Sequence, residues 1–117
     1  MLERTTRKTE MATIGAMFLA DKAEQEKVFT FLEPEDFRHT DTIAVFTAMR
    51  IVNEMDVAID PVTVLNVLGD SDLDGEEIER MMSICISECP SSEHLLDYAK
   101  NVKHNSKVRE EDGTDIH

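Results

Sequence analysis

The chain has 117 residues, of which 41% are hydrophobic and 32% are charged, and its formal net charge is −13. A chain of this length and composition folds as one domain with a modest core, so a disordered protein is excluded. The negative charge repels phosphate backbones, which disfavours direct nucleic-acid binding, and scarce glycine and proline disfavour an all-β fold.

The sequence predicts a polar N-terminal arm followed by the first helix. Residues 1–9 are polar and basic, and we expect them to be flexible. The apolar run MATIGAMFLA at residues 11–20 is too short to span a bilayer, so a signal peptide or membrane contact is not expected. We predict a helix over residues 10–20, buried on more than one side because it is apolar nearly all round.

Helix and turn signals alternate over the next part of the chain. Residues 23–31 predict a second helix, which Pro34 ends. Phe37 is expected to anchor the following turn in the core. A repeat of apolar residues three and four positions apart then predicts a helix over residues 40–55.

A short helix is predicted over residues 61–68. Asp60 is a suitable N-cap, Pro61 is preferred at the first helical position, and Gly69 is a common C-terminal stop.

The acidic stretch DSDLDGEEIERM, residues 70–81, begins like a calcium-binding loop. Such a loop needs a bidentate carboxylate at its twelfth position, where this chain has Met81. We therefore interpret Asp74 as the N-cap of the next helix, with Glu77 completing a capping box. An acidic calcium-binding protein is kept only as a remote alternative.

The last two helices are predicted over residues 75–88 and 92–109, separated by Pro90. Both hold more apolar residues than the single stripe that a helix at the edge of a monomer buries. We expect them to form a C-terminal helical hairpin that is covered by another protein surface. The alternative, that they pack on the other four helices, stays open. Residues 110–117 are expected to be a disordered acidic tail.

No motif for catalysis is present in the sequence. It has no phosphate-binding loop with Gly-Lys, no Gly-x-Ser-x-Gly and no His-Glu-x-x-His, so no enzyme activity and no cofactor is expected. Cys85 and Cys89 fit reduced thiols of a cytoplasmic protein better than a metal site, and His39 fits a surface or capping role.

Four stretches together carry a resemblance to a known family. They are EMATIGAMFLAD at residues 10–21, LEPEDFRHTDTIAVFTAM at 32–49, IDPVTVLNVL at 59–68 and CPSSEHLLDYAKNVKHNSKVR at 89–109. Their order and spacing over residues 10–109 resemble the N-terminal domain of the DnaB-type replicative DNA helicase of bacteria and phages. The family usually has tyrosine and histidine where this chain has Arg38 and Thr42. The family's ATPase domain is expected to be missing.

The resemblance implies a compact helical bundle whose last two helices pair subunits, and a role in docking primase. We therefore expect a protein-interaction module of DNA replication, with itself as one partner (a homodimer or larger) and helicase, primase or loader proteins as others. A phage-type or prophage-type regulator that binds a host helicase or loader is the alternative. The residues expected at the subunit interface are Met81, Met82, Cys85, Ile86, Leu95, Leu96, Ala99 and Val102.

Overall fold

The computed structural model describes residues 2–69 and 74–112, and within these ranges the chain forms helices and no β-strand. The predicted all-α class with six helices is confirmed. None of the helices in these ranges is both long and apolar enough to cross a membrane. In chain order the elements are α1 (Leu2–Leu19), α2 (Lys22–Phe29), the 3₁₀ turn η1 (Pro34–Asp36), α3 (Thr40–Glu54), α4 (Pro61–Leu68), α5 (Gly75–Glu88) and α6 (Leu95–Asp112).

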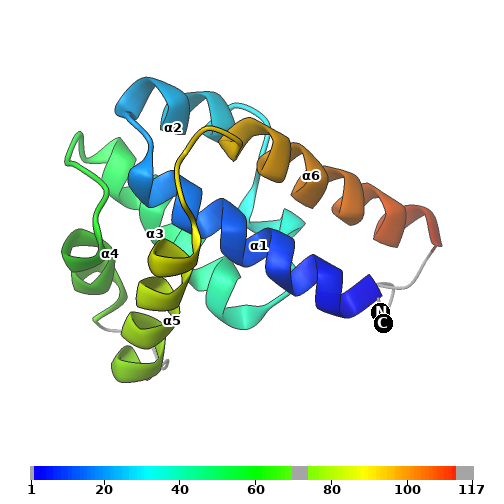
Figure 1. Ribbon diagram of the computed structural model, residues 1–117. Helices are drawn as coiled ribbons and strands as arrows, with labels where there is room; N and C mark the ends of the chain where they lie inside the picture. The colour runs from blue at the N-terminus through cyan, green and yellow to red at the C-terminus, as the bar shows by residue number, and fades with distance from the viewer. Residues whose placement is uncertain (1, 70–73, 113–117) are drawn as a thin grey trace.

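The central element of the bundle is α1. Its most extensive contacts are with α6 and α5, and it also packs on α3. Figure 1 shows α6 beside α1 with the chain running in the opposite direction, and α5 on another side of α1. Ile14, Ala16 and Met17 are fully buried, as expected for a helix that is covered on several sides.

The last two helices do not form the hairpin that we predicted. α5 and α6 hardly contact each other, because each packs mainly on α1 (Figure 1). The segment between Glu88 and Leu95 carries the chain from one side of α1 to the other. The apolar residues that we counted as surplus on these helices are therefore largely used to cover α1.

The predicted start of the first helix and the predicted end of the last helix were wrong. α1 starts at Leu2, so residues 2–9 are helical and do not form the flexible arm that we expected. The polar start of α1 is held by tertiary contacts: Thr6 is buried, and the Arg7 guanidinium binds both carboxylate oxygens of Asp41 at 2.6 and 2.7 Å. At the other end α6 continues to Asp112. The rest of the expected tail, residues 113–117, lies outside the described residues.

The middle helices begin and end close to where their capping residues predict. Asp60 and Thr63 form a reciprocal capping box at the start of α4, and Asp74 accepts a hydrogen bond from the Glu76 amide at the start of α5. Among the described residues at this cap, the predicted capping box between Asp74 and Glu77 is not formed. Phe37 is buried against Phe46, with ring centroids 4.8 Å apart, so it anchors the turn in the core as predicted.

A buried carboxylate joins α1 to the start of α3. Glu10 is only 1% exposed, and it accepts hydrogen bonds from the Arg38 amide at 2.7 Å and the Thr42 hydroxyl at 2.6 Å. The His39 ring nitrogen Nδ1 lies 3.0 Å from the same carboxylate. A buried charge is tolerated only where such partners replace water, so this cluster fixes the turn before α3 on α1.

A second polar cluster joins η1 to α6. Asp36 is buried, and its carboxylate accepts from the Glu33 amide at 2.8 Å and from Lys103 Nζ at 3.2 Å. The Asp36 carbonyl oxygen accepts from Arg109 Nη2 at 3.1 Å. These bonds hold the C-terminal half of α6 on the bundle.

Gly15 is expected to be essential for the close packing of α1 on α5. A Cβ atom at this position would lie 2.8 Å from the Cys85 carbonyl carbon and 3.0 Å from Cys89 Cβ. Gly15→Ala should therefore lower the free energy of unfolding by about 1–3 kcal/mol, the usual cost of overpacking, although alanine is the better helix former. Urea unfolding followed by circular dichroism measures this loss.

The matched control for that substitution is Gly75→Ala. No atom lies within 4 Å of a Cβ placed at Gly75, so this variant should be as stable as the parent or slightly more stable. An equal loss of stability in both variants would contradict the close contact at Gly15.

The Arg7–Asp41 pair is expected to make stability depend on acid pH. The hydrogen bonds from Arg7 lower the pKa of the Asp41 carboxyl, so the pair stabilises the fold above the unfolded-state pKa of about 3.9. This stabilisation is lost as the pH falls through the lowered folded-state value. Asp41→Asn should cost up to about 1 kcal/mol at neutral pH, because the pair is partly exposed, and clearly less at about pH 3, below the unfolded-state value. Urea titrations at both pH values test this, and an equal cost at both would refute it.

Candidate protein-interaction surface

Most of the residues that we predicted at the subunit interface are buried within the chain itself. α1 and the rest of the core cover six of them, so these six expose no continuous face to a partner. Only Ile86 and Leu96 are partly exposed. The pairing of subunits remains a prediction, and the surface for it has to come from other side chains. The six buried residues are Met81, Met82, Cys85, Leu95, Ala99 and Val102.

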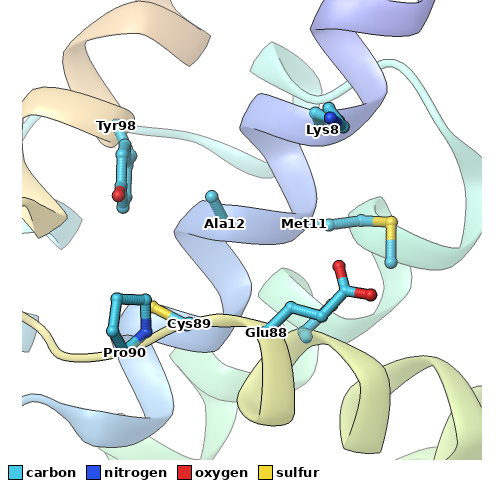
Figure 2. A pocket seen from close by; sticks show the side chains of 8 residues that line it. Lys8, Met11, Ala12, Glu88, Cys89, Pro90 and Tyr98 are labelled. Carbon is cyan, nitrogen blue, oxygen red and sulfur yellow. The ribbon is translucent and has the colours of Figure 1, made fainter.

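The separation of α5 and α6 leaves a cleft of about 220 Å³ over α1, which we call the α1 cleft. α1 contributes Met11 and Ala12, both only partly buried, and α6 contributes the half-buried Tyr98. Figure 2 shows Tyr98 on one side of Ala12 and Glu88, from α5, on another. The complete lining is Lys8, Met11, Ala12, Cys85, Glu88, Cys89, Pro90 and Tyr98.

Both sides of the α1 cleft also carry features that suit a protein partner. Lys8 and Glu88 are exposed and have opposite charges. Ile84 is 39% exposed and lies one helical turn before Glu88, on the same face of α5. An apolar floor with charged residues at its edge is the usual composition of a protein–protein contact.

The two cysteines at this cleft are free thiols with different partners. Cys85 Sγ donates to Met81 Sδ at 3.4 Å, whereas Cys89 Sγ donates to the Ser91 carbonyl oxygen at 3.1 Å. Burial raises the pKa of the Cys85 thiol to about 12, so it carries little thiolate at neutral pH. In the ranges that the structure describes, histidine, cysteine and acidic residues form no group of three that would bind a metal.

The acidic stretch of residues 70–81 is described only in part. Asp70 and Asp72, two of the acidic residues that resemble the start of a calcium-binding loop, lie outside the described residues. Asp74 acts as the helix cap that we predicted, and Glu77 and Glu79 are exposed on α5.

Sequence reasoning missed a second apolar surface, at the end of α3 and on α4. Met55 is 60% exposed and Val62 is 68% exposed, and a groove runs between the two helices there. The segment PVTVLNVL at residues 61–68 held the signal, because a helix of eight residues with five large aliphatic side chains presents them on more than one face. Val64 is fully buried, Leu65, Val67 and Leu68 pack against the core but stay partly exposed, and Val62 is left at the surface.

This all-α bundle, with apolar surfaces in the α1 cleft and on α3 and α4, is a helical protein-interaction domain. The chain belongs to the family of DnaB-like helicase N terminal domains, whose model matches residues 3–104. The resemblance found in the sequence is thereby confirmed.

A solved structure supports the same assignment. The chain is similar to the N-terminal domain of DnaB helicase from Mycobacterium tuberculosis, known from a crystal structure, with a TM-score of 0.78 and 25% sequence identity. The similarity covers 87% of this chain and 71% of that one. Among curated proteins, none matches the sequence. The matched family consists of a non-catalytic domain of helicases. The match therefore indicates a helicase-associated module for oligomerisation and docking.

The Cys85 thiol is expected to be unreactive in the folded protein. With a pKa of about 12 its thiolate fraction at pH 8 is on the order of a thousandfold below that of an exposed cysteine. In a Cys89→Ser variant, iodoacetamide should therefore modify Cys85 at least about a hundredfold more slowly under native conditions than in urea. Mass spectrometry of timed samples measures both rates, and similar rates would show that Cys85 is not buried as described.

Proposed function

We propose that this domain is a protein-interaction module of DNA replication that pairs with a second copy of itself through the α1 cleft. The observation that supports the proposal is the cleft itself, which leaves Met11, Ala12 and Tyr98 partly uncovered between two helices that hardly touch. Apolar side chains in such a position gain stability when another surface removes them from water.

The charges at the α1 cleft favour a symmetric pair. Lys8 belongs to α1 and Glu88 to α5, so each protomer offers one positive and one negative group beside the same apolar floor. In a twofold arrangement the same patch meets itself, and Lys8 then approaches Glu88 of the partner subunit twice. Such complementary charges fix the orientation of two protomers more than they add affinity.

The residues first expected at the interface fall into two groups. Ile86 and Leu96 are partly exposed but do not line the α1 cleft, so any contact that they make with a partner lies outside it. The six buried residues act indirectly, because they hold α5 and α6 apart on α1 and so shape the cleft.

The wider role that we propose is docking within the replication machinery in the cytoplasm, without catalysis by this domain. Family membership supports helicase, primase or loader proteins as partners. The net charge of −13 supports protein partners over direct contact with nucleic acid.

Self-pairing is expected to depend on Ile84. Ile84→Lys places a charge beside the α1 cleft and should weaken the dimer at least about tenfold, as for a central apolar contact. Its side chain is 39% exposed, so the fold should tolerate the change. Size-exclusion chromatography with light scattering over a concentration series measures the dissociation constant. Lys100→Glu, at an exposed position of α6 outside the cleft, is the control and should change it less than about twofold.

The twofold arrangement is tested by exchanging the two charges at the α1 cleft. Lys8→Glu and Glu88→Lys should each weaken pairing about two- to fivefold at low salt, since like charges would then face each other. The double variant should restore the pairing of the parent. A parent chain that stays monomeric at high micromolar concentration would overturn the self-pairing proposal.

A further inference from the structure

Exposed apolar residues are concentrated on one part of the molecule away from the α1 cleft. Of the six large hydrophobic residues that are exposed in the described ranges, four belong to the end of α3, the following segment and α4. They are Ile51, Met55, Val57 and Val62, and none of them lines the α1 cleft.

Two of these residues, Met55 and Val57, line a groove that suits side chains better than a small molecule. The groove has a volume of about 280 Å³ and is lined by Val52, Met55, Val57, Thr63, Asn66 and Val67, which we call the α3/α4 groove. Pockets that enclose small ligands are typically about 300–1,000 Å³. The α3/α4 groove is near the lower limit of that range, a size that fits a few apolar side chains projecting from one face of a helix.

The surroundings of the α3/α4 groove are negatively charged. The chain has a net charge of −13, and residues 51–67, which form the groove, include Glu54, Asp56 and Asp60 but no lysine, arginine or histidine. Glu54 is exposed directly beside Met55. Lys22 Nζ lies 2.6 Å from Asp56 and offsets its charge, and Arg50 binds Glu33, so the exposed Glu54 and Asp60 supply the negative charge at the groove.

We infer that the α3/α4 groove binds a positively charged amphipathic helix of another protein. Aliphatic side chains of that helix fill the groove, and its lysine or arginine residues face the acidic edge. This site is separate from the self-pairing surface proposed above and does not depend on it. It gives the domain a contact for an unlike partner.

A second copy of this chain is a poor occupant of the same groove. Two copies meeting there face to face would bring their acidic edges together, which costs binding energy. α6 has basic residues, such as Lys100 and Lys107, but its apolar side is packed on α1 through Leu95, Ala99 and Val102. It therefore cannot supply the apolar anchors that the groove requires.

The test uses two peptides with the full chain. One is a labelled peptide of about 18 leucine and lysine residues whose leucines form a single helical stripe, and the other has the same composition in scrambled order. Fluorescence anisotropy should give at least about tenfold tighter binding for the striped peptide. Equal binding of the two would show that charge alone attracts them and would overturn the inference.

Variants of the chain then locate the binding site. Met55→Gln combined with Val62→Asn removes apolar surface without adding charge and should weaken binding of the striped peptide at least about tenfold. Glu54→Lys should weaken it about two- to fivefold at low salt, with a smaller effect at high salt. Leu19→Asn is the matched control: this apolar side chain on α1 is 42% exposed and lines neither the α1 cleft nor the α3/α4 groove, so the change should alter the affinity less than about twofold.

The remaining outcomes also decide the question. If Leu19→Asn weakens peptide binding as much as the groove variants do, the site is not the α3/α4 groove. If the groove variants lower the molecular mass in light scattering and leave peptide binding unchanged, the occupant is a second copy. Met55→Gln alone, at a groove-lining side chain that is 60% exposed, repeats the test with little risk to the fold. Loss of peptide binding with unchanged self-pairing would support the inference even if the α1 cleft does not pair subunits.

Discussion

The arrangement of this domain depends on how closely α1 approaches the backbone of α5 at Gly15. No side chain fits there, because the Cys85 carbonyl group and Cys89 Cβ occupy the space that a Cβ atom would need. α5 is therefore held directly on α1, while α6 packs on α1 from another side. Two helices fixed in this way cannot meet each other, and the α1 cleft is the space that remains between them.

Polar side chains then fix the other elements around α1. Glu10 and Asp36 are both buried carboxylates, and each is bonded to groups far away in the sequence. Thr42 stands where the resembling family usually has histidine, and its hydroxyl donates to Glu10. At this departure from the family pattern, Glu10 thus accepts a hydrogen bond from a threonine hydroxyl. Satisfied buried charges of this kind specify one arrangement, since any shift would leave a carboxylate without partners.

The sequence allowed accurate prediction where local chemistry decides the structure. α4 and α5 begin where Asp60 and Asp74 cap them, and these bounds match. The start of α1 could not be predicted in this way, because residues 2–9 lack an apolar period and are held by distant contacts such as Arg7–Asp41. The same limit applies to α6, whose last turns are fixed by Asp36.

The candidate interface shows a related limit. Apolar spacing on α5 and α6 predicted that more than one face is covered, but each helix buries one face, and Ile84 is exposed. α1 covers Met82, Leu95 and Ala99 completely, so the partner for these residues lies in the same chain. The exposed residues of the α3/α4 groove could not be predicted from the sequence either. A short apolar helix is expected to belong to the core unless the positions of the neighbouring elements are known.

The two apolar surfaces of this domain differ in charge, and that difference assigns them to different partners. The α1 cleft has one lysine and one glutamate at its edge, so a twofold contact there is electrically balanced. The α3/α4 groove lies in a segment with acidic residues only, so two copies repel each other there while a basic helix is attracted. Because the two surfaces share no lining residue, occupation of one leaves the other accessible. Under the two proposals made above, the domain pairs with itself through one surface and recruits an unlike protein through the other, as an assembly module requires.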